Sequence, residues 1–357
     1  MNTKSNQTEE SFVETMEITE KVNQPTIDNS TKGFVYMDDV SKILNVALNT
    51  QENVILFGKG GYGKSEYTIE FLKELGIEPF VLTMGSGMTT DRMFGGLDLK
   101  TFNETGKLEY LVQNSFMNHE FVIFEELFDS PDFILEQLKD ILSSGYFRNG
   151  SQVFEIRTKL IICCTNKTRE EFAKNNSLKA LMERFPLELE VKWDNHNRIT
   201  YENLLKTKLG FADPMLTYIL EQYAVQGHTV SPRIAIKSAK IVAQCGPDAL
   251  NYIADFSSKP EVLKSSIAKF KSIFEINELI ESIRQNISLF EQIPFKTLDD
   301  VKQGGKLNKA IYSSILKLKG IKADDSLIQT TTDAIKSFTE VYDRNKKALD
   351  LLVNLED

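Results

Sequence analysis

A short apolar run that leads directly into a glycine-rich loop constrains the fold of this chain more than any other feature. Residues 54–57 are Val-Ile-Leu-Phe, and residues 58–65 read Gly-Lys-Gly-Gly-Tyr-Gly-Lys-Ser. Glycines let backbone N–H groups turn toward a polyphosphate, the lysine adds positive charge, and the serine hydroxyl is a ligand for Mg²⁺. A helix expected from Glu66 to Leu75 would point the positive end of its dipole at the same anion. The sequence therefore predicts a strand, a phosphate-binding loop and a helix.

The residues expected to contact a bound nucleotide are those of this loop and the position after it. They are Gly58, Lys59, Gly60, Gly61, Tyr62, Gly63, Lys64, Ser65 and Glu66. Lys64 is also expected to act on the β- and γ-phosphates during catalysis, and Ser65 to hold Mg²⁺. The alternative reading, a glycine-rich structural turn, is disfavoured by the strand pattern before the loop and the helix pattern after it.

Composition restricts the class of protein. A chain of 357 residues with 41% hydrophobic and 26% charged residues has the make-up of a soluble globular protein of two or three domains. The net charge of -9 argues against a general nucleic-acid coat. No apolar run approaches the length of a membrane span and no signal-peptide pattern opens the chain, so we expect a cytoplasmic protein. The adjacent Cys163 and Cys164 are expected to be buried strand thiols.

Four further apolar runs follow the loop, separated by helical patterns. They are residues 80–84, 121–124, 160–164 and 187–191, and the last alternates as an edge strand does. Unbroken apolar strands alternating with helices predict a parallel sheet covered on both faces. The connection between the second and third strands is too long to be simple, and we expect an inserted hairpin near residues 97–112.

The pattern is helical from Asn197 to the end of the chain. From Pro260, apolar residues recur at helical spacing and predict a helix–helix seam, which we expect Pro294 and Gly304-Gly305 to break. The seam consists of Ile273, Ile276, Ile280, Ile283, Ile287 and Phe290. We therefore divide the chain into a polar N-terminal arm (1–32), a nucleotide-binding α/β core (33–195), an α-helical lid (196–258) and a helical C-terminal extension (259–357).

Polar residues at two strand ends are candidates for catalysis. The strand at 121–124 runs into Glu125 and Glu126, which would place one carboxylate near Mg²⁺ and the next near the attacking water. We assign Glu125 to the metal and Glu126 as general base. Asn166 follows the strand at 160–164, where its amide can orient that water. The alternative readings are two solvated acids at a strand end and an asparagine that opens a turn.

Two arginines complete the predicted site. Arg184 ends a helix just before the last strand, from where it can reach the γ-phosphate of a neighbouring subunit. Arg233 follows Ser231-Pro232 at the start of a helix, where it can touch nucleotide and couple the lid to it. Each arginine could instead be a surface residue held in an ion pair.

In this order the elements resemble those of AAA+ ATPases with a hairpin inserted in helix 2. The chain is most similar to the MoxR-like group, with relatives among chelatase small subunits, midasin-type and McrB-type proteins. The resemblance covers residues 33–258. It rests on Gly58–Ser65, Thr90-Asp91-Arg92, Gly95-Gly96, Glu125-Glu126 followed by Leu-Phe-Asp-Ser-Pro131, Asn166, Arg184-Phe185 and Ser231-Pro232-Arg233.

This resemblance implies a P-loop αβα sandwich with a parallel five-stranded core, followed by an α-helical lid and a C-terminal helical extension. It also implies roles by position: Walker A for Lys64 and Ser65, Walker B for Glu125 and Glu126, sensor 1 for Asn166, arginine finger for Arg184 and sensor 2 for Arg233. Two departures stand out. Glu125 replaces the usual Asp, and Leu-Phe-Asp-Ser-Pro stands where relatives commonly have Ile-Asn-Arg-Ala-Pro.

The function implied by the resemblance is that of a ring-forming ATPase, as a hexamer, that uses Mg-ATP to remodel, load or mature a partner protein or complex. A separate chain with a von Willebrand A domain is the expected type of partner, and GTP stays open as an alternative to ATP. One alternative is a nucleotide-gated assembly module with slow hydrolysis. Another is a McrB-like NTPase motor acting on nucleic acid, against which the acidic charge counts.

Overall fold

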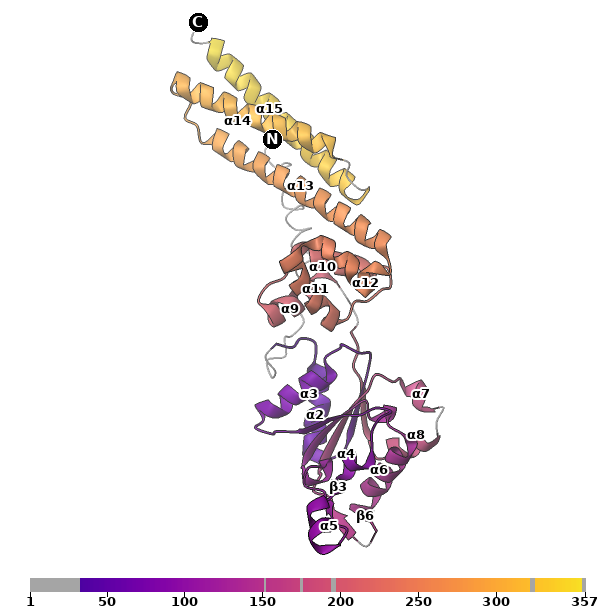
Figure 1. The fold of residues 1–357 in the computed structure, drawn as a ribbon. Coiled ribbons are helices and arrows are strands. Elements are labelled where there is room, and N and C mark those ends of the chain that lie inside the picture. Colours follow the sequence, from indigo (N-terminus) through magenta and orange to yellow (C-terminus); the bar gives the residue numbers. More distant parts are fainter. Residues whose placement is uncertain (1–32, 151, 174–175, 194–196, 322–324, 355–357) are drawn as a thin grey trace. The chain divides into compact units, whose positions relative to one another are not determined.

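The computed structural model describes residues 33–150, 152–173, 176–193, 197–321 and 325–354. The expected N-terminal arm, residues 1–32, lies outside the described residues. The chain forms two compact units (Figure 1): Met1–Asp213 with His228–Gln244, and Pro214–Gly227 with Cys245–Asp357. Residues of the expected lid, 196–258, are divided between the two units.

Five parallel strands form the central sheet of the first unit. They are β1 (Val54–Phe57), β2 (Phe80–Thr83), β5 (Phe121–Glu125), β8 (Leu160–Cys164) and β9 (Leu187–Glu190). The order across the sheet is β2-β5-β8-β1-β9, and every neighbouring pair is parallel. All residues of β1 and β8 are buried, whereas the alternating β9 lies at an edge. The predicted five-stranded parallel core is therefore confirmed.

Helices cover both faces of this sheet, with α2 and α3 on one side and α6 on the other (Figure 1). Their bounds are α2 Asp38–Thr50, α3 Lys64–Glu74 and α6 Asp132–Ser144. Successive strand residues point to opposite faces. Ile162 and Cys164 of β8 accordingly join the core under α2 and α3, whereas Ile161 and Cys163 join the core under α6. The predicted αβα sandwich is confirmed.

Further helices, turns and a hairpin surround the sheet of the first unit. They are α4 (Thr90–Phe94), α7 (Arg169–Ala173), α8 (Asn176–Met182), α9 (Arg198–Leu209), α11 (Pro232–Cys245), the 3-10 turns η1 (Phe116–Asn118) and η2 (Leu127–Asp129), and an antiparallel hairpin of β6 (Tyr146–Asn149) and β7 (Gln152–Glu155). The turn η2 directly follows β5, and it lies next to the end of β8. These connections place polar residues at the carboxyl edge of the sheet.

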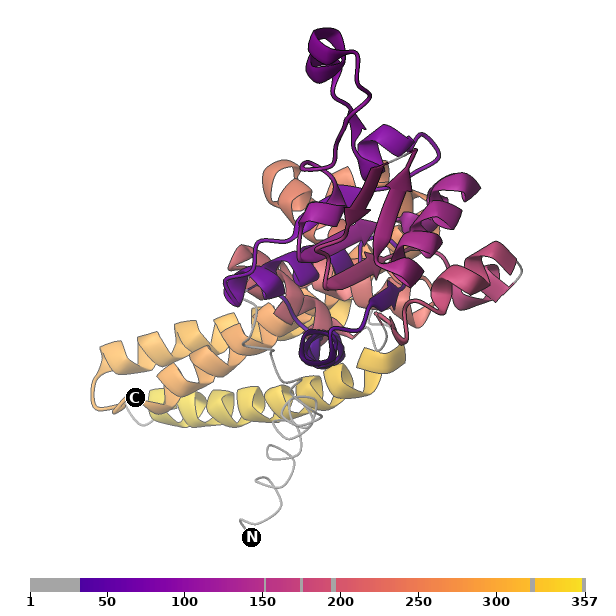
Figure 2. The same ribbon diagram turned by 90° about the horizontal axis from the view of Figure 1, so that it is seen from below.

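The region of the expected insertion projects from the sheet as two short strands and a helix (Figure 2). Strands β3 (Gly96–Leu97) and β4 (Tyr110–Leu111) pair antiparallel, and α5 (Leu99–Thr105) lies between them. The helix is a feature that the hairpin interpretation did not contain. Asp98 caps it by accepting hydrogen bonds from the N–H groups of Lys100 (3.0 Å) and Thr101 (3.1 Å). This local capping pattern is the signal that could have revealed the helix.

The second unit is entirely helical in its described part. Its elements are α10 (Pro214–Val225), the 3-10 turn η3 (Pro247–Tyr252), α12 (Ala254–Ser257), α13 (Pro260–Glu291), α14 (Leu298–Gly320) and α15 (Asp325–Asn354). Helices α13, α14 and α15 share a buried cluster that includes Ile276, Ile280 and Ile283 of the predicted seam. None of the described helices combines the length and apolar character that crossing a bilayer requires.

The expected break at Pro294 is confirmed, because α13 ends at Glu291 and α14 begins at Leu298. The expected break at Gly304 and Gly305 was wrong, because α14 runs through both positions. The reason is packing. Gly304 is buried, and a Cβ atom there would lie 2.8 Å from the Phe295 ring and 3.2 Å from Leu349 Cδ2. A Cβ atom at Gly305 would meet no atom within 4 Å. Gly304 therefore allows close approach of a neighbouring segment, which outweighs its poor helix propensity.

We expect Gly304→Ala and Gly305→Ala to change stability in opposite directions. At Gly305 the added methyl group has space, and alanine should raise the free energy of unfolding by about 0.5–1 kcal/mol. At Gly304 the overpacking cost of about 1–3 kcal/mol exceeds that gain, so the net effect should be destabilising. Urea unfolding followed by far-ultraviolet circular dichroism measures both. Equal stabilisation by the two substitutions would contradict the packing explanation.

Candidate nucleotide-binding site

The loop between β1 and α3 has the backbone geometry that its glycines make possible. Gly58 has φ +140° and Gly63 has φ +84°, values that favour glycine. A Cβ atom at Gly58 would lie 2.4 Å from the carbonyl oxygen of Val191, just after β9. At Gly61 it would lie 3.0 Å from Ser231 Oγ. The loop is thus closely enclosed by segments far away in the sequence.

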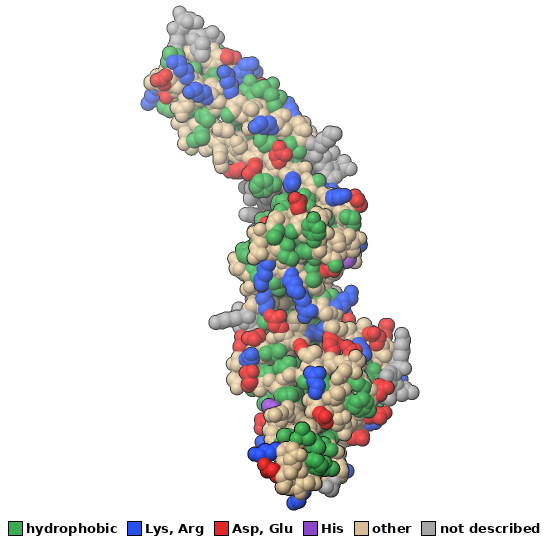
Figure 3. All heavy atoms as spheres, in the orientation of Figure 1, with side chains coloured by type: hydrophobic (Ala, Val, Ile, Leu, Met, Phe, Trp, Pro, Cys, Tyr) green, Lys and Arg blue, Asp and Glu red, His purple; other side chains and the backbone are tan. Residues whose placement is uncertain are grey.

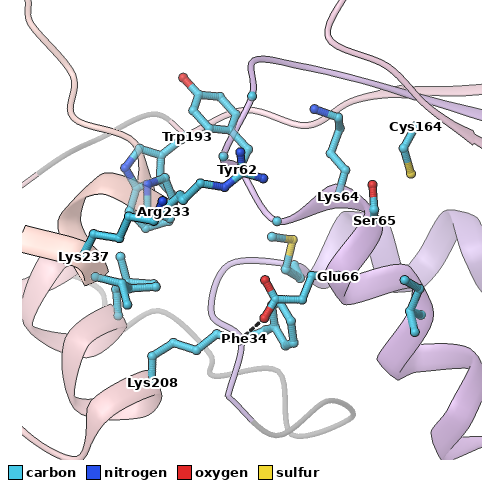
Figure 4. Close-up of a pocket in the computed structure, with 18 of the residues that line it drawn as sticks. Phe34, Tyr62, Lys64, Ser65, Glu66, Cys164, Trp193, Lys208, Arg233 and Lys237 are labelled. Atoms are coloured by element: carbon cyan, nitrogen blue, oxygen red, sulfur yellow. Dashed lines mark hydrogen bonds and ion pairs between the residues drawn. The ribbon is translucent and has the colours of Figure 1, made fainter. Parts of the chain in front are cut away.

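A cavity of about 710 Å³ opens over this loop, within the first unit (Figure 4). Most of the predicted site residues line it, from the loop, two strand ends and α11. They are Gly60, Gly61, Tyr62, Gly63, Lys64, Ser65, Glu66, Glu125, Glu126, Asn166 and Arg233. Gly58 and Lys59 are not among the lining residues, although both contact Lys64 through their backbone carbonyl groups.

Lys64 is a buried cation held by three acceptors. Its Nζ donates to the carbonyl oxygens of Gly58 (2.6 Å) and Lys59 (3.1 Å) and to Asn166 Oδ1 (3.1 Å). The side chain is only 6% exposed, and burial lowers the pKa of its ammonium group. A buried charge of this kind is satisfied by anions or by oriented dipoles. The arrangement suits an ammonium group that binds phosphate oxygens.

The two adjacent acids at the end of β5 make different contacts. Glu125 Oε2 accepts a hydrogen bond of 2.6 Å from Thr83 Oγ1, at the end of the neighbouring strand β2. Glu126 has a left-handed backbone (φ +53°), and its Oε2 accepts from the Asn166 N–H at 3.1 Å. The carboxylates therefore point toward different neighbouring strands. Thr83 also lines the cavity, and it is a residue that the sequence interpretation missed.

The turn after β5 is tied to the end of β8 by a lysine. Lys167 Nζ donates to the carbonyl oxygen of Phe128 (2.7 Å) and forms an ion pair with Asp129 Oδ1 (2.9 Å). Asp129 belongs to the Leu-Phe-Asp-Ser-Pro segment, which departs from the family pattern. Asn166 directly precedes Lys167, and Glu126 lies two residues before Phe128. These contacts therefore join the two segments that carry Glu126 and Asn166.

Helix α11 lines the cavity with three cations. Arg233, Lys237 and Lys240 follow one another at four- and three-residue spacing, and so they share a helical face. The Arg233 N–H donates to the carbonyl oxygen of Gly61 at 3.2 Å, which joins the helix to the phosphate loop. The two lysines were missed in the sequence, although their spacing was a readable signal. Their positive charge matches a polyanionic ligand.

Another part of the cavity wall is apolar. Phe34, Met37, Trp193 and Leu204 contribute to it, and Trp193 is 5% exposed. Lys208 covers this wall, with its Nζ 3.5 Å from the centre of the Phe34 ring. It also pairs with Glu66 at 3.1 Å, as Figure 4 shows. An apolar wall beside a cationic one suits a ligand with a flat base at one end and phosphates at the other.

Cys164 lines the cavity but has no nucleophilic chemistry to offer. It is fully buried at the end of β8, and burial raises the pKa of its thiol to about 12. A thiol with such a pKa is protonated at neutral pH, and the thiolate is the reactive form. Cys163 and Cys164 are both buried and free, as predicted, whereas Cys245 is exposed.

The structure does not bring Arg184 into the cavity of its own chain. Its Nε donates to Ser143 Oγ at 3.0 Å, and its guanidinium lies 3.6 Å from the carboxylate of Glu183. The side chain is 37% exposed, so part of it is accessible to solvent or to another molecule. Arg184 is thus separated from the other predicted site residues within one chain.

Comparison with known families agrees with this geometry. A family model described as the MoxR domain in the MoxR-vWA-beta-propeller ternary systems matches residues 20–214, more than half of the 357 residues. The chain belongs to the MoxR family of AAA+ ATPases. The match spans the phosphate loop of this MoxR protein, both strand-end acids, Asn166 and Arg184, while α11 lies beyond it. The resemblance inferred from the motifs is confirmed.

Individual relatives of this MoxR protein are distant. An uncharacterized protein of Methanocaldococcus jannaschii is 22% identical over 166 residues, which are 46% of this chain and 42% of that protein. NtrX of Brucella abortus in complex with ADP is 12% identical with a TM-score of 0.43, covering 67% of this chain and 54% of that one. A putative ATPase of Cytophaga hutchinsonii is 12% identical with a TM-score of 0.38, and the match covers 74% of this chain and 88% of that one. The chain spans about half the length of the first two. At these values the individual likenesses add nothing to the family assignment.

Proposed function

We propose that this MoxR protein is a ring-forming ATPase that uses Mg-ATP hydrolysis to remodel, load or mature a partner protein or complex. The observation that carries the proposal is the single cavity that gathers the phosphate loop, Glu125, Glu126, Asn166 and Arg233. Phosphoryl transfer depends on positioned charges and an activated water more than on covalent chemistry. These residue types, brought together from four separate segments, meet that requirement.

Lys64 and the N–H groups of the loop would bind the β- and γ-phosphates, and Lys64 would exchange carbonyl acceptors for phosphate oxygens. Ser65 and Glu125 offer a hydroxyl and a carboxylate oxygen in the same cavity, which is the hard donor set that Mg²⁺ prefers. These two residues fit the metal and would hold it. A bound Mg²⁺ would neutralise charge that develops on the phosphates.

Glu126 would act as general base and Asn166 would help to orient the attacking water. The two are already connected, because the Asn166 N–H donates to Glu126 Oε2 and its amide oxygen accepts from Lys64. This line of hydrogen bonds links the phosphate-binding cation to the base. The backbone N–H of Arg233 is hydrogen-bonded to Gly61 of the loop. Arg233 would contact the bound nucleotide and so link nucleotide binding to the position of α11.

Arg184 would serve the cavity of a neighbouring subunit. Its absence from the lining of its own cavity and the partial exposure of its side chain support this role. Hydrolysis would then require assembly, and by family resemblance the assembly would be a hexameric ring. An arginine supplied in trans stabilises the charge of the transition state.

The projecting insertion is the surface that we propose for contact with a partner. Its exposed apolar side chains are Leu99 (65%), Phe102 (42%), Leu108 (59%) and Leu111 (43%). Figure 3 shows hydrophobic side chains gathered at this end of the first unit. Exposed apolar groups at a tip are typical of a protein interaction site. The family description names a vWA and a beta-propeller component, and a separate chain carrying a vWA domain is the partner we propose.

A second candidate function is a nucleotide-gated assembly module with slow turnover. The observation that favours it is Glu125 in the place of the usual Asp, with one carboxylate oxygen engaged by Thr83. If Glu125 holds Mg²⁺ in a less favourable position than Asp would, ATP hydrolysis would be slower while ATP binding would persist. Nucleotide would then mainly control assembly.

The two functions differ in how hydrolysis depends on protein concentration. We expect the ATP turnover per subunit to rise with protein concentration as rings assemble, and to vanish in Glu126→Gln. Phosphate release with ATP and GTP in parallel, together with size-exclusion chromatography, measures both turnover and assembly. A flat, near-zero rate despite nucleotide-dependent assembly would support the module. Failure to bind either nucleotide would refute both functions.

A further inference from the structure

We propose that Thr83 is a positioning residue that holds Glu125 in place as a ligand of Mg²⁺; this inference rests on the proposed function. In the pairing of β2 with β5, Thr83 stands directly beside Glu125. Its hydroxyl donates to Glu125 Oε2 at 2.6 Å. Both side chains line the cavity that also contains Ser65. The contact therefore lies at the proposed metal site.

The length of glutamate explains why such a partner is needed. Glu125 has one more methylene group than aspartate, and thus one more rotatable bond to order before its carboxylate can bind a cation. A hydrogen bond from a fixed donor restricts that freedom in advance. The donor is well fixed here, because the N–H of the next residue, Met84, donates to the Glu125 carbonyl oxygen at 2.8 Å. Backbone and side-chain bonds thus join the same two strand ends.

The chemistry of the bond leaves the carboxylate able to bind metal. A hydroxyl that donates to an ionised carboxylate makes a short, charge-assisted hydrogen bond, which 2.6 Å fits. The bond engages Oε2, and Oε1 is left for the cation or a water bound to it. Thr83 would therefore orient the ligand without itself competing for the electron pair used in coordination. Thr83 and Glu125 would act as a pair that replaces a single aspartate.

The test measures ATP affinity by isothermal titration calorimetry at a series of free Mg²⁺ concentrations. The quantity compared between variants is the Mg²⁺ concentration that gives half of the maximal increase in ATP affinity. In Thr83→Val we expect this concentration to rise about threefold to tenfold, since a hydrogen bond to a charged group is lost at a solvent-exposed position. Thr83→Ser keeps the hydroxyl and should stay close to the unsubstituted protein. ATP binding in EDTA, which does not involve the metal, should be equal in all three proteins and confirms that each is folded.

The same substitution in a Glu125→Asp protein tests whether the effect depends on the Thr83–Glu125 hydrogen bond. In Glu125→Asp the carboxylate is too short to depend on Thr83, so adding Thr83→Val should change the Mg²⁺ requirement less than twofold. An unchanged Mg²⁺ requirement in Thr83→Val, with ATP binding intact, would overturn the role of Thr83 and leave the proposed function standing. A complete absence of ATP binding in the unsubstituted protein would overturn both.

Discussion

Replacement of Glu126 by Gln is expected to lower ATP turnover at least about 100-fold while leaving ATP affinity unchanged. Glutamine has the size of glutamate and keeps an oxygen that can accept from the Asn166 N–H, a bond of 3.1 Å in the structure. The left-handed turn at this position should therefore persist. What is lost is the ability to take a proton from the attacking water.

Turnover is measured by phosphate release and ATP affinity by calorimetry. Glu120→Gln is the matched control, because Glu120 is 56% exposed in a surface ion pair with Lys159, just before the same strand. That substitution should alter neither quantity, since exposed ion pairs contribute little. Retention of more than a tenth of the turnover in Glu126→Gln would assign the base to another group.

The second large effect is expected for Arg184→Ala. If Arg184 completes a neighbour's site, its removal should lower turnover about 1,000-fold or more, as losses of arginine fingers do. ATP affinity should change little, because Arg184 does not line the cavity of its own chain. Arg344→Ala provides a control, since Arg344 is 67% exposed in a long surface contact with Glu291.

A mixing experiment distinguishes action in trans from action in cis. Glu126→Gln subunits retain Arg184, and Arg184→Ala subunits retain the base, so a mixed ring contains some interfaces with both. We expect the mixture to recover part of the turnover that each variant lacks alone. An inactive mixture, with co-assembly verified by size-exclusion chromatography, would refute the trans arrangement.

The core of the fold was predictable because its strands are short, continuous apolar runs. β1 and β8 are buried on both faces, and such runs alternating with helices are typical of a parallel sheet. The phosphate loop was equally readable, because its glycines, lysine and serine are adjacent in the chain. Local chemistry of this kind needs no knowledge of the rest of the molecule.

Features that depend on distant contacts were not predictable. Glycine has a low helix propensity, so Gly304 suggested a break in the helix. Its place inside α14 is explained by the close approach of the Phe295 ring, which leaves no room for a side chain. Thr83 became a candidate through the register of β2 against β5, which the sequence does not state. The partner of Arg184 was not readable either, because the proposed role in trans depends on a second subunit.

Trp193 has a consequence for how the protein is studied. It is the single tryptophan of the sequence, buried in the apolar wall of the cavity, with its ring 5.7 Å from that of Tyr36. Tryptophan fluorescence of the protein thus comes from one position, three residues after the end of strand β9. Every variant discussed above retains it. The intrinsic fluorescence of Trp193 can therefore be used to compare nucleotide binding in the cavity across all of these variants without a label.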